Sequence, residues 1–162
     1  MAELVNSAYR GEASRQGWTT EADYIDGQRT DAQSLARDIA ETPGSRILLL
    51  RDAPEGPLLG AVWLEPVAGG ETCYLGMLTV RPDVQDRGLG RGLLAEAEAA
   101  AKAAGAKRVR MTVVRIRDTL IAWYQRRGYV LTGEIRPWPY HDDRFGQPRR
   151  DDLDFVVMEK TL

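Results

Sequence analysis

The sequence contains few of the residues and segments that would mark it for a metal, a membrane or export. Its 162 residues include one cysteine, Cys73, and one histidine, His141. A single cysteine cannot close an internal disulfide, and a single histidine cannot form a metal site by itself. No window approaches about 18 apolar residues, and the first residues lack the apolar stretch of a signal peptide. We therefore expect a cytoplasmic protein without a metal or a membrane partner.

Neither sign of charge dominates the chain. Lysine and arginine total 22 and aspartate and glutamate total 24, which gives a net charge of −2. A chain without a basic excess lacks the electrostatic signature of nucleic-acid binding, so no nucleic-acid partner is expected. The 43% hydrophobic and 28% charged content is typical of a globular protein, and the length fits one domain, residues 1–162.

The most informative stretch lies at residues 78–94 and reads LTVRPDVQDRGLGRGLL. It is typical of an apolar strand, a polar turn, a glycine-rich loop and the start of a helix. Gly88 and Gly90 have no Cβ atom that would keep a phosphate away from the backbone. The free N–H groups and the positive dipole at a helix N-terminus attract anions. The stretch therefore predicts a site for a phosphorylated ligand, unless it is only a tight strand-to-helix turn.

Spacing excludes two common phosphate-binding loops. A Walker loop ends in Gly-Lys-Ser/Thr, whereas Gly90 is followed by Arg91 and Gly92. A dinucleotide fingerprint requires a third glycine where this chain has Leu93. The remaining pattern, strand-x-Pro-x-x-Gln-x-x-Gly-x-Gly, closely resembles motif A of the GNAT superfamily of acyl-CoA-dependent N-acyltransferases. In that family the loop holds the pyrophosphate of coenzyme A.

A second segment, residues 118–129, reads DTLIAWYQRRGY and resembles motif B of the same family. The resemblance implies that Tyr124 is a general acid, which hydrogen-bonds the coenzyme A thiolate as it leaves and protonates it late. The alternative is that Tyr124 is a core aromatic of an amphipathic helix, beside Ile121 and Trp123.

The resemblance also implies how acetyl-CoA is held. In the family the pantetheine arm pairs with main-chain groups at the end of the fourth strand, which here are the N–H and C=O groups of Leu78 and Val80. The same N–H groups would polarise the thioester carbonyl. The side chain of Gln85 and the backbone of residues 86–91 would hold the pyrophosphate. The implied contacts of acetyl-CoA are Leu78, Thr79, Val80, Gln85, Asp86, Arg87, Gly88, Leu89, Gly90, Arg91 and Arg117.

Arg117 departs from the family pattern, because many members have asparagine at that position. Arginine cannot accept a hydrogen bond but can donate to a phosphate of coenzyme A, and the alternative is a solvated arginine. For the base that removes a proton from the amine, Glu71, just ahead of strand 72–80, is the first candidate. Glu21 is the second, and the alternative for each is a surface carboxylate. His141 is expected to be an exposed loop residue.

Hydrophobic periodicity and turn residues predict alternating helices and strands. In chain order these are helices at 2–10 and 31–41, strands at 46–51, 58–65 and 72–80, a helix at 90–104, a strand at 108–114, a helix at 118–127, and strands at 129–133 and 153–159. Asp31 is a predicted N-cap, and Gly76 suggests a bulge or a close backbone approach within its strand. Glu98 is expected to pair with Lys102.

These elements predict a mixed α/β fold of three layers. The resemblance implies a GNAT-like α/β/α arrangement whose mostly antiparallel central sheet splits between its fourth and fifth strands. Residues 1–45 would form a helical cover on the acceptor side, 46–127 the acyl-CoA-binding core, and 128–162 the closing strands and loop. Family members usually begin with a further strand. Either that strand is missing here or the gene start was assigned too late. If it is missing, the sheet has an uncovered edge that invites dimerisation, so we expect a monomer or a homodimer.

The function that the resemblance implies is N-acetylation. The enzyme would move an acetyl group from acetyl-CoA to a primary amine of a small molecule or peptide, by direct attack in a ternary complex. Two other interpretations remain. One is a non-catalytic sensor that binds acyl-CoA on the same fold, and the other is a nucleotide-binding protein that uses the loop differently.

Overall fold

The computed structural model describes residues 1–162 and contains every helix and strand that the sequence predicts. The elements in chain order are α1 (Ala2–Tyr9), η1 (Glu12–Gln16), β1 (Ile25–Asp26), α2 (Ala32–Glu41), β2 (Arg46–Arg51), β3 (Leu58–Pro66), β4 (Thr72–Val80), η2 (Pro82–Val84), α3 (Leu89–Ala103), β5 (Arg108–Val114), α4 (Asp118–Gln125), β6 (Val130–Pro137), η3 (Asp143–Phe145), β7 (Gln147–Pro148) and β8 (Asp154–Thr161). The short strands β1 and β7 and the three 3-10 turns were not predicted. No helix has the length and apolar character needed to cross a membrane.

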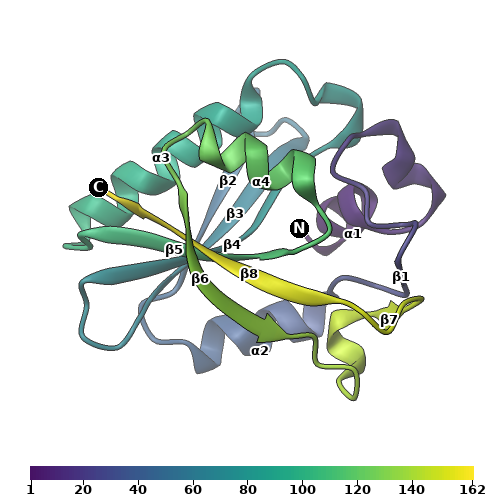
Figure 1. Ribbon diagram of the computed structural model, residues 1–162. Helices are drawn as coiled ribbons and strands as arrows, with labels where there is room; N and C mark the ends of the chain where they lie inside the picture. Colours follow the sequence, from purple (N-terminus) through teal and green to yellow (C-terminus); the bar gives the residue numbers. More distant parts are fainter.

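Six strands form the central sheet, in the order β2-β3-β4-β5-β8-β6. Neighbouring strands run antiparallel, except that β4 and β5 are parallel. Helices α3 and α4 lie on one face of the sheet and α2 on the other (Figure 1). The predicted mixed α/β fold with a mostly antiparallel sheet is confirmed.

The two edges of the sheet are β2 and β6. Within residues 1–162 no strand precedes α1, so β2 has a partner on one side only. β1 does not join the central sheet. It pairs instead with β7 in a separate two-stranded ribbon, which ties the segment after η1 to the loop after β6.

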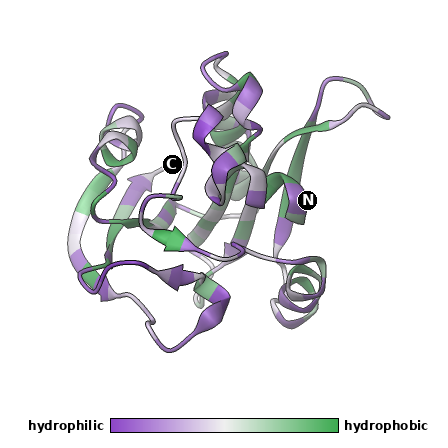
Figure 2. Cartoon of the chain, turned by 90° about the vertical axis from the view of Figure 1, so that its right-hand side faces the viewer, coloured by the Kyte–Doolittle hydropathy of each residue, from purple (hydrophilic) through white to green (hydrophobic).

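The main hydrophobic core lies between the sheet and helices α3 and α4. Alternate residues of the strands point to this face, because strand side chains alternate with a period of two. The residues of α3 that are buried there, as their helical spacing predicts, are Leu93, Leu94, Ala97 and Ala101. In Figure 2 much of the hydrophobic colour lies along the strands, and the surrounding loops are mainly hydrophilic.

Strands β4 and β5 separate after a short paired stretch. Thr72, Cys73 and Tyr74 pair with residues 108–110, and no pairing continues beyond Tyr74. The predicted split between the fourth and fifth strands is therefore present. Backbone groups in the later part of β4 that point towards β5 have no strand to bond to, so the split exposes main-chain donors and acceptors inside the fold.

A β-bulge in β4 accompanies the split. Pairing with β3 passes from Gly76 opposite Trp63 to Thr79 opposite Ala61, so β4 has one residue more than β3 over this stretch. Met77, within the bulge, has a φ of 47°, in the left-handed region. A bulge bends its strand and increases the local twist, which turns the end of β4 away from β5. The bulge that Gly76 suggested is therefore found at the residues that follow it.

Two side-chain predictions have different outcomes. Asp31 caps α2 as predicted, by accepting a hydrogen bond from a backbone N–H of the first turn at 2.8 Å. The predicted pair of Glu98 with Lys102 is wrong. Glu98 accepts hydrogen bonds from the Tyr129 hydroxyl at 3.0 Å and from Lys160 Nζ at 2.6 Å. The sequence periodicity of one helix does not reveal these partners, because they come from the closing strands.

Candidate active site

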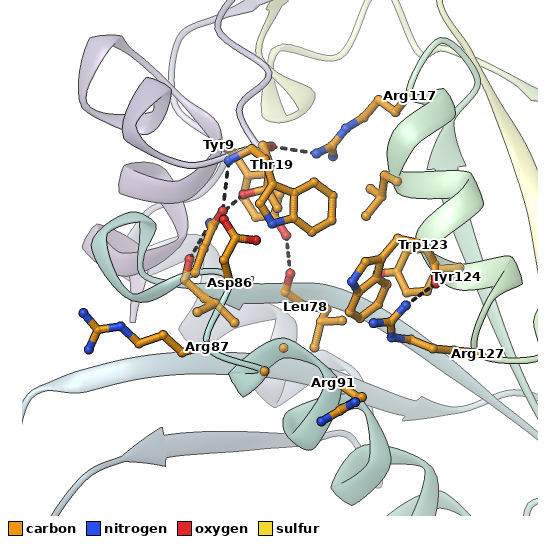
Figure 3. A pocket seen from close by; sticks show the side chains of 16 residues that line it. Tyr9, Thr19, Leu78, Asp86, Arg87, Arg91, Arg117, Trp123, Tyr124 and Arg127 are labelled. Carbon is orange, nitrogen blue, oxygen red and sulfur yellow. Dashed lines mark hydrogen bonds between the residues drawn. The ribbon is translucent and has the colours of Figure 1, made fainter.

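Two cavities lie on either side of the gap between β4 and β5. The first cavity has a volume of about 460 Å³ and lies between the end of β4, the glycine-rich loop and α4 (Figure 3). All of the predicted cofactor contacts line it except Thr79 and Leu89. The predicted catalytic Tyr124 also lines it, together with six residues that were not predicted for the site: Tyr9, Trp18, Thr19, Leu120, Trp123 and Arg127.

The second cavity, also of about 460 Å³, is formed by β4, β5, the end of β6 and the loop around η3. Its walls are largely apolar and aromatic. It adjoins the first cavity, because five residues line both of them: Tyr9, Leu78, Arg117, Leu120 and Tyr124. The split in the sheet therefore joins two chambers, and these five residues surround the junction.

The glycine-rich loop presents the N-terminus of α3 to the first cavity. Asp86 and Gly88 both have left-handed backbone conformations, with φ of 64° and 80°. No side chain caps α3, whose early helical hydrogen bonds include that from Gly92 N–H to Gly88 O at 3.0 Å. The N–H groups of the first turn therefore have no helical acceptor, and the helix dipole adds positive potential at the same place. The geometry is that of an anion site.

Three arginines surround this anion site. Arg87 and Arg91 come from the predicted loop, and Arg127 follows α4. The Arg127 guanidinium lies 3.5 Å from the centre of the Trp123 ring, and its Nε is buried without a partner. Burial lowers the pKa of Arg127, and repulsion from Arg126 and Arg91 lowers it further. A bound phosphate would offset that repulsion. The two adjacent arginines just after Tyr124 in the sequence, Arg126 and Arg127, are the sequence signal that could have indicated this part of the anion site.

The Gln85 side chain makes three hydrogen bonds within the protein. Its Oε1 accepts a hydrogen bond from Trp18 N–H at 3.0 Å, and its Nε2 donates to Thr19 Oγ1 and to Val80 O, both at 2.9 Å. A Cβ atom on Gly17 would lie 2.6 Å from Gln85 Oε1, so only glycine allows this approach. The Gln85 side chain thus joins the segment after η1 to the end of β4, and its predicted contact with pyrophosphate stays a prediction.

The backbone of Leu78 and Val80 faces the gap. Arg81 N–H donates to Leu59 O in β3, so the alternation of a strand turns the peptide groups of Leu78 and Val80 away from β3. Their carbonyl oxygens are already used, by the Tyr9 hydroxyl and by Gln85 Nε2. Each carbonyl oxygen has a second lone pair, so the predicted contacts of these N–H and C=O groups with the pantetheine arm stay predictions.

Thr79 and Leu89 do not reach either cavity with their side chains. Thr79 is almost fully buried and donates a hydrogen bond to Met77 O at 2.9 Å, within the bulge. Leu89 begins α3, and only its backbone belongs to the anion site.

Tyr124 lies at the junction of the two cavities. It is 6% exposed, and its ring packs edge-on against Trp123 and Tyr129, with centroids 5.0 and 5.6 Å away. Its hydroxyl makes no hydrogen bond to another residue. Burial, followed by the nearby Tyr9, raises the pKa of Tyr124, so the phenol keeps its proton. The side chain is both part of the core and a free donor at the junction.

Arg117 and Glu21 belong to one buried network. Glu21 Oε1 accepts a hydrogen bond from Arg117 Nη1 at 2.8 Å, and its Oε2 pairs with Arg10. Arg117 also donates to Thr19 O at 2.6 Å, and all three charged side chains are at most 8% exposed. Arg117 is therefore buried and paired rather than solvated, and its predicted contact with a phosphate stays a prediction. No sequence signal indicated this pairing across 96 positions.

Burial alone would raise the pKa of Glu21, but Arg117 and Arg10 outweigh it, so the pKa lies below its ordinary value. A paired carboxylate with a lowered pKa is a weak base, and the structure does not support Glu21 as the proton acceptor. Glu71 also lies outside the site. It is exposed, pairs with Lys107 and lines neither cavity. The carboxylate that lines the second cavity without an arginine partner is Glu65, which the sequence did not indicate.

Comparison with known proteins identifies the family. The sequence model described as the Acetyltransferase (GNAT) family matches residues 5–129. The chain belongs to this family. It is therefore an acetyl-CoA-dependent acetyltransferase, as the two motifs predicted, and acetyl-CoA is its cosubstrate.

Solved structures of acetyltransferases share the fold. A GNAT family acetyltransferase from Elizabethkingia anophelis, with acetyl-CoA bound, has a TM-score of 0.66 at 18% identity, over 82% of this chain and 84% of that chain. Ribosomal-protein-alanine N-acetyltransferase from Brucella melitensis has a TM-score of 0.64 at 20% identity, over 82% and 80%. Nourseothricin acetyltransferase has a TM-score of 0.61 at 24% identity, over 74% and 66%. No curated protein matches the sequence.

The first cavity fits acetyl-CoA. The N-terminus of α3 and the arginines Arg87, Arg91 and Arg127 suit its phosphates, and the free N–H groups of β4 suit its amide-bearing arm. No group of three or more His, Cys, Asp or Glu side chains is placed to hold a metal ion.

Replacing Gly88 tests the anion site. Gly88→Val should weaken acetyl-CoA binding about tenfold or more, because a β-branched residue is strained at φ 80° and would redirect the loop N–H groups. Isothermal titration with acetyl-CoA measures the loss. Gly105→Val is the matched control, since Gly105 has a φ of 96° at the other end of α3. Normal affinity in Gly88→Val, or an equal loss in both variants, would contradict the assignment.

Glu21→Gln tests the buried network. At pH 7 the change should lower the free energy of unfolding by about 3 kcal/mol, because it leaves two buried guanidinium groups without a carboxylate. The folded-state pKa of Glu21 is lowered, so its contribution is complete above its ordinary pKa and is lost as the pH falls through the folded value. Urea unfolding should therefore show that the difference in the free energy of unfolding between Glu21→Gln and wild type becomes smaller at acid pH. The control Glu12→Gln, at an exposed position, should change the free energy of unfolding little. If the loss of stability in Glu21→Gln does not depend on pH, the result would argue against the network.

Proposed function

We propose that the enzyme transfers the acetyl group of acetyl-CoA to a primary amine of a small molecule or peptide, by direct attack within a ternary complex. The observation that carries the proposal is that two cavities adjoin at Leu78 and Tyr124, where β4 and β5 separate. Acetyl-CoA in the first cavity would place its thioester at the junction. The amine would approach the same carbon from the second cavity.

The donor would be held along its whole length. Its phosphates would lie against the N-terminus of α3 and the arginine cluster, and its arm would run beside the end of β4. The N–H groups of Leu78 and Val80 face that path, where one would bond the arm and one would polarise the thioester carbonyl. Because the split in the sheet leaves them unpaired, these donors are present before the substrate arrives.

The reaction forms a C–N bond and breaks the C–S bond. The amine loses one proton, and the departing coenzyme A thiolate gains one. Tyr124 is the proposed donor to the thiolate, since its hydroxyl is free at the junction and protonated. A thiol has an ordinary pKa of roughly 8.5 and a phenol roughly 10, so complete transfer is uphill. Tyr124 would therefore hydrogen-bond the thiolate first and yield its proton late.

Direct attack is favoured because neither cavity is lined by a cysteine, serine or lysine that could carry the acetyl group. Cys73 is buried and lines neither cavity. For the proton of the amine, Glu65 in the second cavity is the proposed acceptor, through water.

Thiol release with acetyl-CoA and a panel of amines tests this function. Wild type should release coenzyme A only when an amine is present, with intersecting initial-velocity lines, whereas an acetyl-enzyme route would give parallel lines. Tyr124→Phe should keep its acetyl-CoA affinity and lower kcat on the order of 100-fold. Tyr129→Phe removes a hydroxyl that lies outside both cavities and is the matched control. Binding without turnover by any amine, or an unchanged kcat in Tyr124→Phe, would contradict the proposal.

A further inference from the structure

The second cavity carries an excess of positive charge. Its charged lining residues are the arginines Arg10, Arg29, Arg117 and Arg136 and the glutamates Glu21 and Glu65. The lining has four guanidinium groups and two carboxylates, and Arg136 also pairs with Glu134 outside the lining, so one positive charge remains in excess. A chamber that accepted a polycationic amine would need the opposite balance, because like charges in a partly desolvated space repel.

The excess does not disappear when the ion pairs are considered. Arg10 and Arg117 share the single carboxylate of Glu21, so the buried network keeps one positive charge. Arg29 makes no ion pair and no hydrogen bond through its side chain. It is half-buried, and its backbone N–H is fixed by Asn6 Oδ1 at 2.7 Å. Arg29 is therefore a cation held at the cavity wall with all of its side-chain donors unused.

Two buried donors in the same lining also lack partners. Arg10 Nε and Trp138 Nε1 are both buried without a hydrogen bond. A buried N–H without an acceptor is costly, and native proteins rarely leave one unpaired. No acceptor atom among the lining side chains is unpartnered in this way. Both side chains belong to the cavity lining, and an oxyanion of a ligand is an acceptor of the kind that their N–H groups lack.

The remaining wall is apolar. Trp138 and Phe155 stack with ring centroids 5.0 Å apart, and Phe145 packs against both. Pro137 and Pro139 flank Trp138 in the same lining. Such a wall suits a hydrocarbon or aromatic group better than a chain of hydroxyl or ammonium groups.

We infer that the acceptor is an α-amino acid with an apolar side chain, whose carboxylate binds Arg29 and the unpartnered donors of the second cavity. The inference rests on the proposed function and names its substrate class. The carboxylate would orient the α-amine towards the junction, and the side chain would lie against the aromatic wall. The positive surroundings also disfavour the ammonium form, so the amine would lose its proton without a strong base. This accounts for the lack of a free carboxylate at the junction.

Matched acceptors test the inference. L-leucine and L-phenylalanine are compared with isopentylamine and 2-phenylethylamine, which lack only the carboxylate, and with L-leucinamide and spermidine. Rates are compared per concentration of neutral amine. The amino acids should have values of kcat/KM about 10 to 100 times higher than the decarboxylated amines, as expected for charge-assisted hydrogen bonds to a carboxylate.

Arg29→Gln identifies the residue that recognises the carboxylate. It should lower kcat/KM for the amino acids about 10 to 100 times, mainly by raising KM. The values of kcat/KM for the decarboxylated amines should stay within about twofold of wild type. Arg37→Gln is the matched control, because exposed Arg37 of α2 lines an outer cavity and not the second one. Calorimetric binding of N-acetyl-L-leucine to the coenzyme A complex gives a readout apart from turnover, and it should weaken in Arg29→Gln alone.

The outcomes distinguish a failure of the amino-acid assignment from a failure of the proposed acetyltransferase function. A preference for spermidine or the decarboxylated amines, or equal losses for both series in Arg29→Gln, would overturn the amino-acid assignment and leave the acetyltransferase proposal standing. If acetyl-CoA binds and no amine of either series is acetylated, the proposed function fails and this inference fails with it.

Discussion

The site depends on one constraint, the loss of pairing between two parallel neighbours of the sheet. β4 and β5 pair for three residues, and a bulge at Met77 then turns β4 aside. Unpaired backbone groups inside a protein are costly unless something bonds to them. Here Tyr9 and Gln85 satisfy the carbonyls of Leu78 and Val80, whereas the N–H groups face the gap. The same opening joins the two cavities, so that a donor and an acceptor can meet through the sheet.

Polar contacts hold the N-terminal segment over this gap, in addition to the apolar packing of α1 against Met77. The Tyr9 hydroxyl donates a hydrogen bond to β4, and Gln85 accepts one from Trp18 N–H. Arg117 donates to Thr19 O and forms an ion pair with Glu21. Each contact joins residues far apart in the sequence, at the edge of the junction. Breaking one buried ion pair leaves an uncompensated charge, which makes such contacts sensitive to mutation. The cover and the catalytic junction are therefore coupled through the same few side chains.

The fold could be predicted from the sequence because its signals are local. Apolar runs, turn glycines and the Asp31 cap located the elements, and residues 78–94 located the anion site. The side-chain roles could not be predicted in the same way. Gln85 bonds Trp18 and Glu21 pairs with Arg117 across more than 60 positions of sequence. Glu71 precedes β4, as expected, but it pairs with Lys107 and lines neither cavity. Pairings of this kind arise from tertiary packing, which periodicity does not encode.

Amide hydrogen exchange at the end of β4 tests the central claim most directly. The ¹⁵N-labelled protein is measured alone and saturated with acetyl-CoA, with saturation verified by titration. The account predicts that exchange of the Leu78 and Val80 N–H groups slows on binding, because the arm bonds them in the gap, while Thr79 N–H, which faces β3, changes less. Unchanged exchange at Leu78 and Val80 in the saturated protein would contradict it.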